Sequence, residues 1–220
     1  TTIFVFKNAD LSKIEDEIKG FSSDLFIFLR HIQECFIHIE GVETKDYIMQ
    51  SAPRAGYDYF TLDNTSWKIM RSQSAALAFK EENGKIISCS EKEAVYHCFL
   101  PTLDKSPFNF KINAGFSTDP SRKHLVNDDI TEAALKDIAA LICDSITKIL
   151  RGQITVDSQM LSLFRGQKNF SPTNQKLMER IKKRMAESKI LLNDGSEISI
   201  TQYKILPEWI TPQEKAIIRS

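Results

Sequence analysis

Apolar and polar positions alternate with different periods along the 220-residue chain, and the period predicts which segments are strands or helices. Near the start, β-branched and aromatic residues predict a strand at Thr2–Phe6. A charged segment closed by glycine predicts a helix at Asp10–Lys19. A second helix is predicted by apolar residues at helical spacing, namely Leu25, Leu29, Ile32 and Phe36, with a β-like run at Cys35–Ile39.

The centre of the chain has the pattern of consecutive strands. Asp63-Asn64-Thr65 and Glu82-Asn83-Gly84 are turn signals, and the second is the stronger because Asn-Gly tolerates positive φ. We therefore expect hairpins and a mainly antiparallel sheet. The predicted strands are Tyr57–Leu62, Ser66–Ser72, Ala76–Lys80, Lys85–Ser88, Ala94–Leu100 and Phe108–Phe116, with a Pro-containing loop between the last two.

The second half of the chain has two strong helical patterns. Asp128 and Asp129 cap a helix at Thr131–Arg151, whose continuous apolar stripe is expected to pack on the sheet. Another helix is predicted at Thr173–Ser188, after Ser171-Pro172. A hairpin at Leu191–Ile200 and a C-terminal helix opening at Thr211 complete the prediction.

Together these elements predict an α+β fold, with a mixed, mainly antiparallel sheet covered by helices and a helical N-terminal connector. We expect three regions: a connector at 1–50, a β-rich domain with its helix at 51–152, and a helical and hairpin extension at 153–220.

Composition narrows the classes of function. Lys plus Arg and Asp plus Glu both total 29, so net charge favours neither nucleic acid nor a membrane surface as a general partner. Four cysteines have no Cys-x-x-Cys spacing, which favours a reducing cytosol. We expect no membrane span, because no apolar run reaches about 20 residues. The abrupt start on a strand pattern favours an excised fragment of a cytoplasmic protein.

Candidate chemistry concentrates between 94 and 126, where a turn-rich segment follows the Phe-rich strand. This turn carries Asp119, Ser121, Arg122 and Lys123, and such groups can hold an anion. No complete phosphate-binding or catalytic motif accompanies the turn. His97 and Cys98 are adjacent on one predicted strand, so they point to opposite faces and cannot form a nucleophile pair. We therefore expect no catalysis by this chain alone.

The histidines give no metal-ligand spacing, so we propose no metal site. A local excess of six positive charges lies at Arg165–Lys189. One side of the predicted helix carries Lys176, Arg180, Lys183 and Arg184, which could contact nucleic-acid phosphates. A solvated helix face, or a face against an acidic protein partner, is the alternative and the better supported one.

Two segments resemble the GHKL ATPases, the superfamily of gyrase, heat-shock chaperone ATPases and histidine kinases. TTIFVF and the following LSKIEDEIKGFSSDLFIFLRHIQ are similar to the last strand of the ATP-binding domain and the helices beyond it. HCFLPTLDKSPFNFKINAGFSTDPSRKHL is similar to the region that follows this domain in sacsin-like proteins. Ala114-Gly115 departs from the pattern, because relatives often have an acidic residue there.

The resemblance implies that an upstream ATP-binding domain of the same protein holds ATP and Mg²⁺, and it allows a homodimer of that protein. Thr1 would correspond to a family Thr at the adenine end of ATP. Arg122 or Lys123 would reach the γ-phosphate, and Ser121 would orient the turn. The alternative for Arg122 is an internal ion pair with Asp119 or Asp128. The family's magnesium-binding Asn helix, Asp-x-Gly loop and Gly-rich lid are missing from this chain, so we expect coupling rather than autonomous ATP binding.

These observations leave three kinds of function open. The resemblance favours a non-catalytic fragment that couples ATP binding upstream to a conformational change. The basic helix favours a nucleic-acid-binding module, and a protein-interaction domain is the third alternative.

Overall fold

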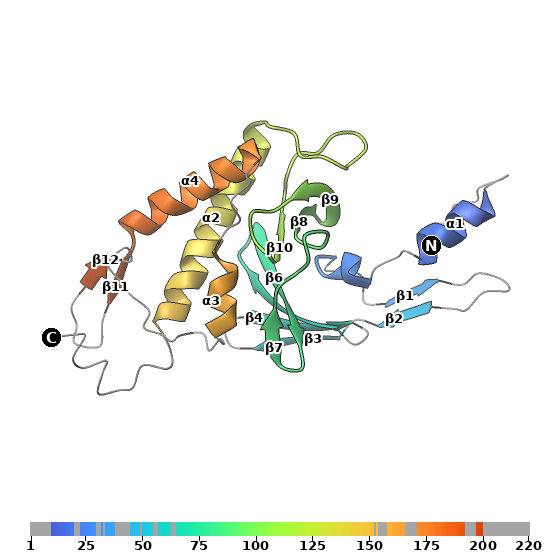
Figure 1. Cartoon of the computed structure of the whole chain (residues 1–220), viewed down its shortest axis with the longest axis horizontal. Coiled ribbons are helices and arrows are strands. Elements are labelled where there is room, and N and C mark those ends of the chain that lie inside the picture. The colour runs from blue at the N-terminus through green and yellow to red at the C-terminus, as the bar shows by residue number, and fades with distance from the viewer. Residues whose placement is uncertain are drawn as a thin grey trace.

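The computed structural model has an α+β fold, as predicted from the sequence (Figure 1). It describes residues 10–19, 23–29, 32, 34–37, 45–48, 50–54, 57–62, 65–151, 153, 158–165, 171–191 and 197–199. The predicted strand at Thr2–Phe6, the C-terminal helix from Thr211 and the candidate residue Thr1 lie outside these ranges.

The central sheet is mixed and mainly antiparallel in the described part of the chain. Its only parallel pair there joins β8 to β10, and β7 (Lys85–Ile87) pairs with β6 outside the main path. The main path runs through β3 (Gln50–Arg54), β4 (Tyr57–Leu62), β5 (Thr65–Arg71), β6 (Ala75–Glu82), β10 (Lys111–Ala114), β8 (Val95–Cys98) and β9 (Leu100–Lys105).

Turn chemistry explains where the chain reverses between these strands. Asn83 and Gly84 have φ values of 51° and 77°, which confirms the predicted tight hairpin between β6 and β7. The predicted single strand Ala94–Leu100 is wrong in its last part. Phe99 adopts a φ of 63°, so the chain reverses there and Leu100–Lys105 pairs back on β8. The Pro-containing segment is therefore a strand rather than a loop, and Pro101 is accommodated because β9 is an edge strand.

The structure corrects two further predictions of secondary structure, one of a helix and one of the length of a strand. Among the described residues of this segment, the predicted helix around Leu25–Phe36 is not formed: a 3₁₀ turn, η1 (Ser23–Phe26), precedes β1 (Glu34–Ile37), which pairs with β2 (Lys45–Ile48). Three consecutive residues, Phe26, Ile27 and Phe28, are all buried in one cluster with Trp67, Ala76 and Ala78, which a helix with one apolar stripe would not allow. The predicted strand Phe108–Phe116 contains only the four residues of β10.

Helix α2 (Asp129–Leu150) covers the face of the sheet opposite to the cluster of Phe26, Ile27 and Phe28 (Figure 1). It contributes the centre of the larger of the two cores. Its N-cap is Asp128, whose carboxylate accepts from the Thr131 amide at 2.9 Å, as the sequence predicts. The core that α2 shares with β6 and β10 contains Leu77, Phe79, Phe110, Ile112, Leu135, Ile138 and Ile142. No helix within the described ranges is long and apolar enough to cross a lipid bilayer.

The C-terminal helices add to the same core. Helices α3 (Ser158–Leu163) and α4 (Pro172–Glu187) bury Met160, Leu163, Leu177 and Ile181 against it. Pro172 follows the N-cap Ser171 at the first helical position, as predicted. Strands β11 (Lys189–Leu191) and β12 (Glu197–Ser199) form the predicted hairpin, and α1 spans Leu11–Lys19.

A buried polar contact fixes α4 to the sheet. The Tyr96 hydroxyl donates to the Asn174 Oδ1 atom at 2.8 Å, and the Asn174 amide nitrogen donates to the Lys105 carbonyl at 3.1 Å. Both side chains are almost fully buried. The Tyr96 hydroxyl and the Lys105 carbonyl would both lose these hydrogen bonds if Asn174 were removed, so this contact holds α4 in one position on the sheet.

Asn174→Ala should lower the free energy of unfolding by about 1–3 kcal/mol, because it leaves the buried Tyr96 hydroxyl without this partner. Urea unfolding would measure the change. Lys183→Ala on the exposed side of the same helix is the matched control and should stay within about 0.5 kcal/mol of the unmodified chain. Equal effects of the two substitutions would contradict a stabilising role for the buried contact.

Candidate functional site

The turn predicted to carry the chemistry forms a closed loop between β10 and α2, here named the Asp119 loop (residues 117–126). Its two sides are joined by a β-bridge between Thr118 and Leu125 and by a hydrogen bond from the Val126 amide to the Ser117 carbonyl at 2.9 Å. At its base, the Ser117 amide donates to Thr131 Oγ1 of α2 at 3.3 Å. The loop is therefore fixed at both ends.

The carboxylate of Asp119 organises the tip of the loop. It accepts from the Ser121 hydroxyl at 2.6 Å and from the amides of Lys123 and His124 at 2.8 and 3.1 Å. These bonds, led by the one from Ser121, hold the pKa of Asp119 below its ordinary value. The donors that could hold an external anion are thus occupied by a carboxylate of the loop itself, and the side chains of Arg122 and Lys123 are left for a partner.

Arg122 stands at the tip with a backbone φ of 59°. A non-glycine residue in this left-handed region is strained unless its surroundings hold it there, and the Arg122 amide donates to the Asp119 carbonyl at 2.8 Å. Its guanidinium is exposed and contacts the Cys98 carbonyl at 3.5 Å, the limit of a hydrogen bond. Among the described residues Arg122 has no carboxylate partner, so neither Asp119 nor Asp128 forms the ion pair expected as the alternative.

A second carboxylate ties the loop to the neighbouring hairpin. Asp104 of β9 accepts from the Leu125 amide at 2.5 Å and lies 3.1 Å from the His124 ring nitrogen Nδ1. The Leu103 amide donates to the Lys123 carbonyl at 2.7 Å. The Asp119 loop consequently lies along β9 rather than projecting freely into solvent.

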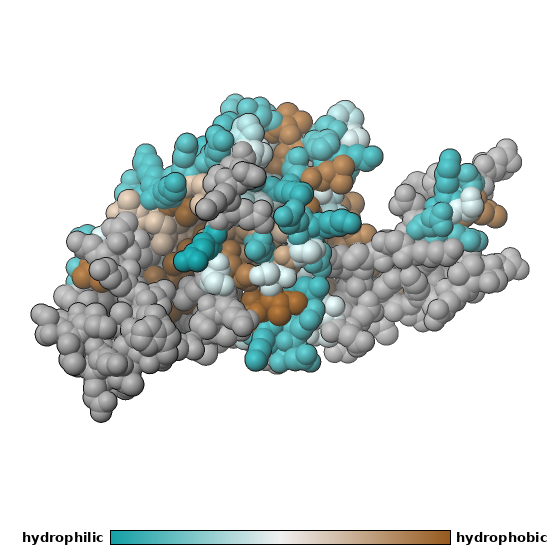
Figure 2. Space-filling model, viewed as in Figure 1, coloured by the Kyte–Doolittle hydropathy of each residue, from teal (hydrophilic) through white to brown (hydrophobic). Residues whose placement is uncertain are grey.

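Large apolar side chains are exposed around the Asp119 loop. Phe99 is held in its strained turn by Asn113, whose Oδ1 accepts from the Phe99 amide at 2.8 Å. Figure 2 shows apolar surface at this end of the molecule, over β9 and beside the start of α2. Exposed apolar area of this kind is typical of a surface that another protein or domain covers. The residues are Phe99, Leu100, Leu103, Val126 and Ile130, with 39–62% of each exposed.

The predicted basic helix face is largely engaged with α2. Lys176 donates to Glu132 at 2.5 Å and to Asn127 at 2.7 Å, and Arg180 also contacts Glu132. Arg184 lies 3.4 Å from Asp144. Lys183 is exposed and has no ion pair with a described residue. Three of the four candidate residues for nucleic acid therefore hold α4 against α2.

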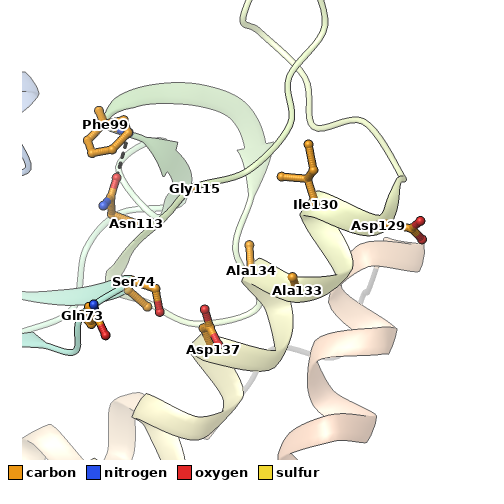
Figure 3. Close-up of a pocket in the computed structure, with 11 residues that line it drawn as sticks. Gln73, Ser74, Phe99, Asn113, Gly115, Asp129, Ile130, Ala133, Ala134 and Asp137 are labelled. Atoms are coloured by element: carbon orange, nitrogen blue, oxygen red, sulfur yellow. Dashed lines mark hydrogen bonds between the residues drawn. The ribbon is translucent and has the colours of Figure 1, made fainter.

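Sequence reasoning missed a hollow at the end of the sheet, named here the α2 hollow. It has a volume of about 710 Å³ and lies between the β5–β6 turn, the end of β10 and the first half of α2 (Figure 3). Small side chains leave this space open, namely those of Ala75, Gly115, Ala133 and Ala134. These residues come from three distant parts of the sequence, so their common location is visible only in the folded chain.

A comparison of the chain with protein-family models, curated proteins and solved structures finds no significant match to any of them. The geometry described above is therefore the main basis for a functional assignment.

Asp119→Ala should loosen the tip of the loop, because the Lys123 and His124 amides lose their acceptor. We expect trypsin to cleave the folded chain after Arg122 or Lys123 faster by a factor of roughly ten. Asp129→Ala is the control, since Asp129 is exposed and accepts no hydrogen bond from a described side chain. Unchanged cleavage in Asp119→Ala would show that other contacts alone order the loop.

The docking of α4 should weaken in acid. The side chains of Lys176 and then Arg180 hold the pKa of Glu132 below its ordinary value of 4.5. A lowered pKa in the folded state gives stability that is present above the unfolded value and lost as the pH falls through the folded value. Hydrogen exchange of α4 amides between pH 6 and pH 3 should therefore accelerate relative to the intrinsic rate.

Glu132→Gln should remove this pH dependence, whereas Glu179→Gln on the exposed side of α4 should retain it. An identical pH profile in the two variants would rule out Glu132 as the group responsible.

Proposed function

We propose that this chain is a non-catalytic part of a larger GHKL-type ATPase and couples ATP binding in an upstream domain to a conformational change. The resemblance of its first segment to the end of the ATP-binding domain, and of residues 97–125 to the region that follows, supports this placement. The proposal assigns ATP and Mg²⁺ to the upstream domain. The Asp119 loop would face that domain when ATP is bound.

The observation that carries the proposal is the state of Arg122. Its guanidinium is exposed on a loop anchored at both ends, has no carboxylate partner among the described residues and contacts the carbonyl of Cys98, whose neighbours Phe99 and Leu100 are exposed apolar residues. Phosphoryl transfer is accelerated mainly by positioning and by neutralising charge on the phosphate oxygens, and an arginine from an adjoining domain can do both. An arginine that was already paired internally could not do so without breaking that pair.

The chemistry of the loop fits a shared site better than a complete one. The Lys123 and His124 amides and the Ser121 hydroxyl are bound to Asp119, so they are not free to cradle a phosphate. Arg122 and Lys123 can supply positive charge, but ATP would need most of its contacts from the upstream domain. Ser121 would act by orienting the loop, and Thr1 remains a candidate adenine contact outside the described residues.

Coupling follows from a difference in contact between two states. With ATP bound upstream, Arg122 gains a phosphate partner and the exposed apolar side chains of Leu100, Leu103 and Val126 are covered. Without ATP, the phosphate contact is lost and only the apolar contact remains. A ligand shifts a conformational equilibrium only by such a difference in binding free energy. Because α2 and the sheet share one core, the sheet would move as a rigid body.

Arg122→Ala in the full-length ATPase should lower kcat for ATP hydrolysis on the order of 10²-fold or more, with little change in KM for ATP. The reason is that the guanidinium acts on charge that develops in the transition state. A steady-state assay would measure both constants, and Lys123→Ala would show whether the neighbouring base contributes. Lys183→Ala, an exposed base remote from the Asp119 loop, is the control.

The proposal would be overturned if ATP turnover and domain closure both remained unchanged in Arg122→Ala and Lys123→Ala.

The alternative of a nucleic-acid-binding module has less support, because three of its four candidate bases are paired with acidic side chains of α2.

A further inference from the structure

The α2 hollow has a lining that favours one kind of occupant. Its charged lining groups are two carboxylates, Asp129 and Asp137, and no Lys or Arg is among its lining residues. Figure 3 shows the Asp137 side chain extending from α2 toward the β5–β6 turn, with Ser74 across the gap. The polar part of the hollow is therefore acidic, with hydrogen-bonding side chains at Gln73 and Ser74.

Apart from Asn113, the remainder of the lining is apolar, with small residues inside and two larger ones at the border. Ala75, Ala133 and Ala134 line the hollow, and apart from Gly115 and its two chain neighbours no heavy atom lies within 4 Å of where a side-chain carbon of Gly115 would stand. Ile130 and Phe99 border this space and are 59% and 50% exposed. An aliphatic chain could lie on this surface, and a larger apolar neighbour could cover Ile130 and Phe99.

Asp137 is the more buried of the two carboxylates that line the hollow, and it differs from the carboxylates that are bound nearby. Asp104, Asp119 and Asp128 each accept hydrogen bonds from nearby amides. Asp137 is half-buried in the side of α2, and within the described ranges no hydrogen bond or ion pair engages its carboxylate. Partial burial makes an ionised carboxylate less well hydrated, so a cation that enters the hollow is favoured.

We propose that the α2 hollow is a docking site for a segment of a partner protein that carries a lysine or arginine flanked by apolar residues. The cationic head would pair with Asp137 while its aliphatic stem lies on the alanines, as long basic side chains do on apolar surfaces. The flanking apolar residues would cover Ile130 and Phe99.

The lining also argues against an anionic occupant. The N-terminus of α2 would attract an anion, but Asp128 already caps it and Asp129 adds a second negative charge in the first turn. The volume of the hollow exceeds what one lysine side chain fills, which favours a segment of several residues over a free amine. A second hollow of about 250 Å³ shares Gln73, Ser74 and Asp137 and continues the groove along α2.

The test uses the ¹⁵N-labelled chain and the peptide acetyl-Leu-Lys-Leu-amide. NMR titration should show saturable shifts at Ala75, Gly115, Ala133 and Ala134, with millimolar affinity. Asp137→Asn should weaken binding about three- to fivefold, the effect of one partly exposed ion pair. Glu179→Gln is the matched control, because Glu179 is exposed on α4 and lines neither hollow, and it should leave the affinity unchanged.

Two further probes separate charge from apolar contact. A peptide with norleucine in place of lysine should bind several-fold more weakly, and one with glutamate should not bind. Ala133→Leu fills the hollow from an exposed helix position and should abolish the shifts without unfolding the chain.

Absence of localised shifts with the lysine peptide would overturn the docking site. Equal binding of the norleucine or glutamate peptide, or of the lysine peptide to Asp137→Asn, would overturn the assigned chemistry. None of these outcomes depends on ATP or on Arg122, so they are independent of the proposed coupling function.

Discussion

The packing of α2 against β6 and β10 is the constraint on which the rest of the structure depends. Ala75, Leu77 and Phe79 from β6 and Ile112 and Ala114 from β10 meet Leu135, Ile138 and Ile142 in one core. The Asp119 loop connects β10 directly to α2, so this core fixes where the loop begins and ends. The strained conformation of Arg122 is tolerated because rigid elements hold both ends of the segment.

The central elements could be predicted from the sequence because their signals are local. Asn83-Gly84 specifies a tight turn by its φ values, and the apolar stripe of α2 repeats at helical spacing over about four turns. The reversal at Phe99 could not be predicted in this way. A bulky residue at positive φ has no local preference for it, and here the buried amide of Asn113, distant in sequence, stabilises the turn.

The candidate site was predictable only in part, because local sequence signals mark the turn but not the contacts between residues distant in the chain. The sequence identifies Arg122 and Lys123 in a turn, and the spacing of Asp119 and Ser121 is typical of side chains that bond their own turn. The α2 hollow depends on residues from three separate elements and leaves no signal in a single segment. The pairing of the basic face of α4 also depends on the fold, since Glu132 contacts Lys176 and Arg180 only because α2 lies beside them.

The position of β10 within the sheet has a consequence for the order of assembly. Strands β3 to β7 are joined by hairpins and can associate as the chain emerges, and β8 and β9 form a second ribbon. The two ribbons become one sheet only when β10 enters between them and pairs with β6 on one side and with β8 on the other. A nascent chain that ends before Lys111 therefore carries two unpaired inner edges, the kind of surface that recruits strands from other molecules. Protection of those edges by a chaperone or a partner would matter most during this interval of synthesis.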